Sequence, residues 1–116
     1  MGELDNSESD RLARLSELFT EAGFISRMLT DIRSEIWLKL WGNLTFNPLS
    51  ALIHSTLVDI CQYPPTRELA TAMMSEAQAV AECPGVTFRV SIEKRIDGAE
   101  HVGKHETSML QDVEAS

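Results

Sequence analysis

Lys39, Asn43 and Asn47 are spaced at i, i+4 and i+8 within a segment that has helical apolar periodicity. This spacing puts the three side chains on one helical face, beside a stripe of apolar residues. Gly42 and Pro48 lie in the same segment, although both residue types disfavour a helix interior. A protonated lysine next to two amides can donate to a developing oxyanion, which predicts a polar pocket. The alternative is a solvated helix face near a proline kink, and the pattern alone favours that alternative.

Two further pairs of reactive side chains carry a weaker signal. His101 and His105 are four residues apart, a spacing that can place two imidazoles on one metal ion. The sequence offers no third ligand, so we expect a surface pair and no metal site. Cys61 and Cys83 have no motif spacing, and we expect two buried free thiols.

The composition bounds the class of protein. The 116 residues are enough for one domain, and 43% of them are hydrophobic. Ten Lys and Arg against eighteen Asp and Glu give a net charge of -8, which argues against nucleic-acid binding and against docking on an anionic membrane. The acidic N-terminus does not resemble a signal peptide, and no apolar run is long enough to span a bilayer. We therefore expect a cytoplasmic protein.

The apolar periodicity predicts an all-α domain of five or six helices. The first helix is expected near residues 9–22, capped by Ser7 or Ser9. Pro48 is expected to break or kink the second helix, after which the helical rhythm resumes at 49–60. The remaining helices are expected to follow caps at Thr66 and Ser91 and to begin near Ser108. Residues 86–90 alternate in polarity, which is equally compatible with a short strand and with a loop.

The chain resembles a known enzyme family along nearly its whole length. Residues 31–43 (DIRSEIWLKLWGN) and 47–52 (NPLSAL) resemble the opening of the C-terminal domain of ketopantoate reductases, also called 2-dehydropantoate 2-reductases. Residues 105–112 (HETSMLQD) resemble the Ser-Met-x-Gln-Asp segment of that family. Gly2-Glu3 resembles the Gly-Glu that ends its N-terminal domain.

The resemblance implies a fold and a domain organisation. The fold is a multi-helix domain like the C-terminal domain of 6-phosphogluconate dehydrogenase-type enzymes, truncated at its C-terminus. Residues 1–8 would be the linker from a missing N-terminal Rossmann domain. Residues 9–116 would form an incomplete helical substrate-binding and catalytic domain.

The resemblance also implies roles for four side chains. Lys39 would be the general acid that protonates the ketone oxygen as NADPH delivers hydride. Asn43 and Asn47 would orient the substrate and the lysine, and Ser108 would bind the polar end of the substrate. The product of the whole enzyme would be pantoate, formed from a small 2-keto acid on the route to pantothenate.

Three departures from the family pattern stand out. No Gly-x-Gly-x-x-Gly or Gly-Lys-Ser/Thr loop is present in the 116 residues, so no site for a nucleotide phosphate is visible. The substrate-contacting glutamate that follows the second motif in the family is also absent. Glu106 stands where relatives often carry a basic residue, which would change the charge near the pocket.

Two functions follow as hypotheses. In the first, the chain is the C-terminal domain of an NADPH-dependent 2-dehydropantoate 2-reductase, inactive alone because it holds half of the active-site cleft. The full enzyme could also be a homodimer. In the second, it is a stand-alone helical interaction or dimerisation module without catalysis, which binds partners through exposed apolar surface.

Overall fold

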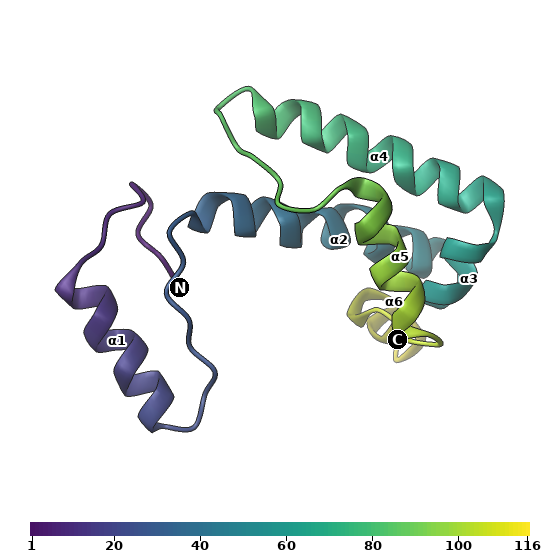
Figure 1. The fold of residues 1–116 in the computed structure, drawn as a ribbon. Helices are drawn as coiled ribbons and strands as arrows, with labels where there is room; N and C mark the ends of the chain where they lie inside the picture. Colours follow the sequence, from purple (N-terminus) through teal and green to yellow (C-terminus); the bar gives the residue numbers. More distant parts are fainter. The chain divides into compact units, whose positions relative to one another are not determined.

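The computed structural model describes residues 1–116 as six helices joined by loops, without a strand (Figure 1). The helices are α1 (Asp10–Glu21), α2 (Ile32–Ile53), α3 (Leu57–Gln62), α4 (Pro64–Glu82), α5 (Ile92–Val102) and α6 (Ser108–Glu114). The predicted all-α class is therefore confirmed. None of these helices combines the length and the apolar character that crossing a bilayer would require. The chain forms two compact units, residues 1–36 and residues 37–116.

The first unit is organised around the N-terminal cap of α1. The Ser9 hydroxyl accepts a hydrogen bond from the Leu12 N–H at 3.1 Å and donates to the Glu3 carboxylate at 2.5 Å. The same carboxylate pairs with Arg11, and these contacts hold the pKa of Glu3 below its usual value, with the Ser9 bond as the main cause. The helix predicted near 9–22 is thus confirmed, with Ser9 as its cap.

Gly2 lies where no larger residue fits. A Cβ atom at this position would come within 2.6 Å of the Leu29 carbonyl oxygen and 2.8 Å of Ile32 Cβ. The close approach lets the Leu29 N–H donate to the Met1 carbonyl at 2.8 Å. A glycine is therefore needed for the first residues to lie against the segment that leads into α2.

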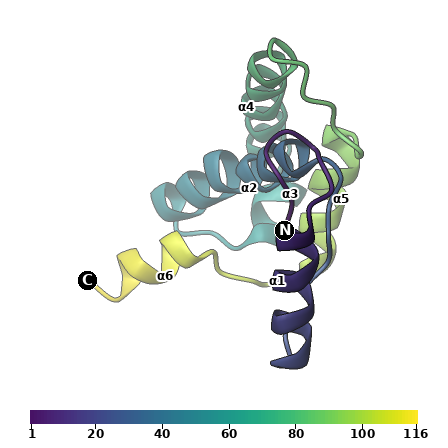
Figure 2. The ribbon, with the colours of Figure 1, turned by 90° about the vertical axis from the view of Figure 1, so that its left-hand side faces the viewer.

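The second unit has a core built from four helices. Trp41 on α2 is fully buried, and its ring stacks on Phe88 with the centroids 4.1 Å apart. Phe88 belongs to the segment 86–90, which is a loop, as one of the two predicted alternatives had it. This loop and α6 lie at opposite ends of the unit (Figures 1 and 2). The buried core residues are Leu38, Trp41, Phe46, Leu49, Ile60, Cys61, Ala70, Met74, Ile96 and Ala99.

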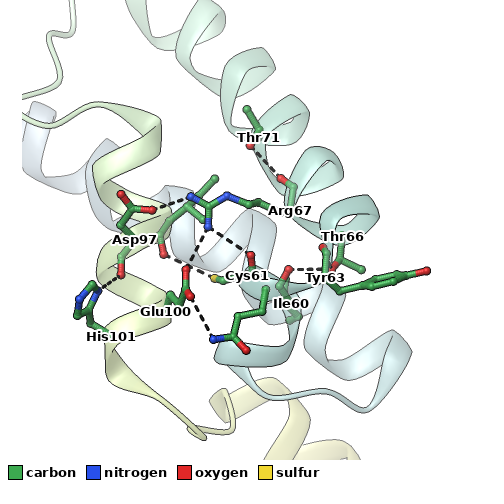
Figure 3. A network of polar contacts seen from close by, with 11 residues as sticks. Ile60, Cys61, Tyr63, Thr66, Arg67, Thr71, Asp97, Glu100 and His101 are labelled. Atoms are coloured by element: carbon green, nitrogen blue, oxygen red, sulfur yellow. Dashed lines mark hydrogen bonds and ion pairs between the residues drawn. The ribbon is translucent and has the colours of Figure 1, made fainter.

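Arg67 ties three helices of this unit together (Figure 3). Its guanidinium donates to Asp97 at 2.6 Å and to Glu100 at 3.2 Å on α5, and to the Cys61 carbonyl at 3.2 Å on α3. Gln62 on α3 adds a further bond to Glu100 at 3.2 Å. These bonds fix α5 against α3 and α4, and α5 is the helix that faces α2 across the site described below.

Of the two outcomes predicted at Pro48, a break or a kink, the break is wrong, because α2 continues through this residue to Ile53. Proline removes one hydrogen bond from the helix interior. The residues on both sides of it are buried, with Phe46 2% and Leu49 7% exposed, and their packing keeps the helix continuous. The chain turns instead at His54, whose φ of 49° is one that histidine adopts more readily than most residues. The predicted run 49–60 is therefore two helices.

The predicted cap at Thr66 is also wrong, because α4 already begins at Pro64. The N–H groups of the first helical turn have no acceptor within the helix, so two prolines, which lack this N–H, are tolerated there. The Thr66 hydroxyl instead donates to the Ile60 carbonyl at 2.7 Å, which ties α4 to α3.

The two cysteines are both free, and only one is buried. Burial raises the pKa of the Cys61 thiol to about 11, so this thiol is neutral and unreactive at physiological pH. Cys83 is exposed near the end of α4. The prediction of buried thiols is confirmed for Cys61 and wrong for Cys83.

Candidate functional site

A groove of about 460 Å³ lies in the second unit, between the middle of α2, the first residue of α3, α5 and the loop that leads into α6. All four side chains named from the sequence line it. Lys39, Asn43 and Asn47 come from α2, and Ser108 comes from the start of α6. The structure therefore brings together residues that are far apart in the chain.

The groove side of α2 is a continuous helical stripe. Lys39, Asn43 and Asn47 are four residues apart, Gly42 and Phe46 lie three residues after Lys39 and Asn43, and all five line the groove. Lys39 and Asn43 are exposed and Asn47 is half-buried, so their polar ends are accessible to a ligand. The other face of the same helix carries Trp41 into the core, and this burial fixes the direction in which the polar stripe points.

A pair of buried hydroxyls places Ser108 beside this stripe. Thr107 caps α6 by accepting a hydrogen bond from the Leu110 N–H at 3.2 Å, and its hydroxyl lies 2.5 Å from the Ser50 hydroxyl. Ser50 uses its only proton to donate to the Asn47 carbonyl at 2.9 Å. The proton between the two hydroxyls must therefore come from Thr107. This relay links the start of α6 directly to the turn of α2 that carries Asn47.

We expect Thr107→Val to destabilise the 116-residue chain by about 1–3 kcal/mol. The substitution keeps the shape of the side chain, but it leaves the buried Ser50 hydroxyl without its donor and the Leu110 N–H without its cap. Urea unfolding followed by circular dichroism measures the change. Thr71→Val is the matched control, because the Thr71 hydroxyl is exposed and bonds only within its own helix. Equal stabilities of the two variants would contradict the relay.

Arg95 lines the same groove from α5, and the sequence analysis missed it. Its guanidinium lies 5.8 Å from the centroid of the Phe46 ring. A Cβ atom on Gly42 would come within 2.9 Å of an Arg95 Nη atom, so the glycine leaves room for this side chain. A signal for it exists in the sequence. Arg95 falls at helical spacing between Ile92 and Ala99, so it interrupts an otherwise apolar face of α5.

The groove carries positive charge in an acidic protein. Lys39 and Arg95 line it, His105 adds a titratable ring, and no Asp or Glu is among its lining residues. The chain as a whole has a net charge of -8, so this concentration of cations is local. A small concave site with two cations, two amides and a hydroxyl suits a small anion that also carries hydrogen-bonding groups.

The remaining titratable residues named from the sequence lie apart from this arrangement or at its edge. The His101 ring nitrogen lies 2.7 Å from the Asp97 carbonyl, whereas His105 lines the groove. Both rings are exposed, and no group of three or more His, Cys, Asp or Glu side chains is placed to hold a metal ion. Glu106 is exposed and does not line the groove, so its side chain leaves the charge of the lining unchanged.

Comparison with known families gives a match over most of the chain. Residues 31–116 match the family described as "Ketopantoate reductase PanE/ApbA C terminal". This range includes the groove and every residue that lines it. A 2-dehydropantoate 2-reductase from Mesorhizobium japonicum is 52% identical over 114 residues, which are 98% of this chain and 35% of that protein.

Solved structures agree with the sequence match. A Ralstonia solanacearum protein assigned as a ketopantoate reductase has a TM-score of 0.90 at 37% identity, covering 95% of this chain and 34% of its own. A 2-dehydropantoate 2-reductase from Methylococcus capsulatus has a TM-score of 0.84 at 32% identity, covering 98% of this chain and 37% of its own. The chain thus spans about a third of the length of the relatives it matches.

Proposed function

The chain belongs to the family of ketopantoate reductase C-terminal domains, and from this premise we propose that it supplies the substrate-binding half of a 2-dehydropantoate 2-reductase. One observation carries the proposal. Lys39, Asn43, Asn47 and Ser108, which the family resemblance names from two separate motifs, line one cationic groove. A 2-keto acid is a small anion with a polar carbonyl, and it matches the chemistry of this groove.

In the proposed mechanism, Lys39 acts as the general acid. Its protonated amine lies at the ketone oxygen of the bound substrate and donates a proton as negative charge develops there. The side-chain amides of Asn43 and Asn47 donate and accept hydrogen bonds. These bonds orient the substrate relative to the lysine. The Ser108 hydroxyl binds the polar end of the substrate. The product of this reduction is pantoate.

The second reactant is NADPH, and the residues of this chain do not fit its phosphates. The 116 residues include no glycine-rich phosphate loop, and the groove is of a size for a small acid. When bound to the enzyme, the cofactor supplies the hydride that reduces the carbonyl carbon. We propose that a Rossmann domain preceding residues 1–8 holds it, that these residues are the linker, and that 9–116 are part of the helical domain of a cytoplasmic enzyme.

An exchange into a complete relative tests this function. We define the carrier enzyme as the Mesorhizobium japonicum relative in which this chain replaces the segment that it matches. We expect the carrier enzyme to oxidise NADPH when 2-dehydropantoate is added, with the decrease in absorbance at the nicotinamide band as the measurement. A correctly folded carrier enzyme without 2-dehydropantoate-dependent turnover would refute the proposed function.

A further inference from the structure

We infer that Arg95 binds the carboxylate of the 2-keto acid substrate and makes the site selective for acids over neutral ketones. The inference rests on the proposed function, because it assigns a further residue to the same groove. It goes beyond the four residues that the family resemblance named, since Arg95 lies in neither of their two motifs.

The Arg95 guanidinium has no carboxylate or other hydrogen-bonding partner in the protein. It makes no hydrogen bond and no ion pair. By contrast, the guanidinium of Arg67 on α4 pairs with Asp97 and Glu100, which lie on α5 with Arg95. An arginine that served only to fix α5 would be expected to have such a carboxylate. The five N–H groups of Arg95 are instead available for a bidentate bond to a carboxylate from solution.

The groove also positions this guanidinium without neutralising its charge. The Phe46 ring lies 5.8 Å from Arg95, close enough for a cation–π contact. An aromatic ring accepts no conventional N–H hydrogen bond from the guanidinium here, so the N–H groups stay available to a ligand. Gly42 supplies the necessary room, because a Cβ atom there would be 2.9 Å from an Arg95 Nη atom. Glycine lowers the helix propensity of α2 at this position, but it leaves space for the Arg95 guanidinium.

Arg95 from α5 and Lys39 from α2 line the same groove at neighbouring positions along α2. A Cβ atom on Gly42 would meet the Arg95 guanidinium, and Gly42 follows Lys39 by three residues, a rise of about 4.5 Å along α2. The carboxylate and the ketone of a 2-keto acid are on adjacent carbons. One small molecule can therefore present its ketone to Lys39 and its carboxylate to Arg95. No Asp or Glu lines the groove, so no carboxylate of the lining competes with the ligand for either cation.

The test is the kinetics of Arg95→Gln in the carrier enzyme. We expect the KM for 2-dehydropantoate to rise about 10- to 100-fold while kcat stays within about 3-fold, because a charge-assisted bond made equally in the ground and transition states is lost. We also expect the preference for 2-dehydropantoate over its neutral 2-keto amide to fall by a similar factor. A merely structural arginine would not change this preference.

Two further variants complete the design. Lys94→Gln is the matched control, since Lys94 is the neighbouring residue on α5, carries the same charge, is exposed and does not line the groove. Its KM should equal that of the unsubstituted enzyme. Arg95→Lys keeps the charge and loses the bidentate fork, so its KM should rise by less than that of Arg95→Gln. If circular dichroism shows that Arg95→Gln does not fold, the KM of Arg95→Lys becomes the test. A raised KM would support the role of Arg95, and an unchanged KM would overturn it.

The outcomes separate this inference from the proposed function. Unchanged KM and unchanged acid preference in Arg95→Gln, in a carrier enzyme that still reduces 2-dehydropantoate, would overturn the role of Arg95 and leave the function intact. A carrier enzyme that does not reduce 2-dehydropantoate even without substitution would overturn both.

Discussion

Replacing Lys39 with alanine in the carrier enzyme is expected to lower kcat by about 10²- to 10⁴-fold, the range typical of a lost general acid. The KM should change little, because the proton is transferred only in the transition state. Lys39 suits a general-acid role structurally, because it lines the groove from α2 and forms no ion pair with the protein. Initial rates of NADPH oxidation with 2-dehydropantoate measure the effect.

Two comparisons separate proton donation from other roles of Lys39. Lys94→Ala removes the same charge outside the groove and should leave kcat unchanged. Lys39→Arg keeps a positive charge on a group that gives up its proton far less readily, so it should restore little of the lost rate. A small alkylamine added to Lys39→Ala should restore part of it. A kcat of Lys39→Ala within about 3-fold of the unsubstituted enzyme would refute the assignment.

The 116-residue chain alone is expected to show no oxidation of NADPH with 2-dehydropantoate. The groove holds the proposed acid and the substrate contacts, whereas the 116 residues include no glycine-rich phosphate loop. In the same assay and at equal concentrations, the carrier enzyme should therefore oxidise NADPH, and the isolated chain should show only the background rate. Measurable turnover by the purified chain would contradict the division of the site between two domains.

The alternative function, an interaction or dimerisation module, has its own measurement. Several large apolar side chains of the second unit are exposed, including Leu52 at 78% and Val102 at 59%. Such surface is typical of a region that another part of a protein covers. Light scattering shows whether the chain associates with itself. Association combined with an inactive carrier enzyme would favour the module, and an active carrier enzyme would favour the reductase.

Local sequence signals were sufficient for most of the helices. Ser9 and Ser91 cap α1 and α5 as predicted, because a hydroxyl that accepts from an N–H three residues later is a local contact. The end of α5 at Gly103 is local in the same sense, since this glycine has a φ of 83°, which residues with a side chain rarely adopt. These interactions depend on neighbours in the chain, and the sequence shows those neighbours directly.

Tertiary packing decided where the predictions failed. The continuation of α2 through Pro48 depends on the burial of Phe46 and Leu49 against other helices. The start of α4 at Pro64 is coupled to a bond from Thr66 to α3. No local pattern contains these contacts, so a proline was taken as a break in one case and missed as a helix start in the other.

In the candidate site, too, local spacing could be predicted from the sequence and contacts between distant segments could not. The helical spacing of Lys39, Asn43 and Asn47 was enough to put them on one face, although it could not tell a pocket from a solvated surface. Ser108 came only from the resemblance, because its position beside α2 depends on the buried Thr107–Ser50 hydrogen bond between distant segments. Arg95 was missed because a lone arginine on an apolar helical face has meaning only once α5 is placed against Gly42.

A crystal structure of the carrier enzyme with bound pantoate would show whether Lys39 reaches the reacting oxygen. We expect the hydroxyl formed from the ketone to lie within about 3 Å of Lys39 Nζ, with the product in the groove between α2 and α5. Pantoate bound elsewhere, or bound in the groove with that hydroxyl beyond hydrogen-bonding reach of Lys39, would contradict this expectation.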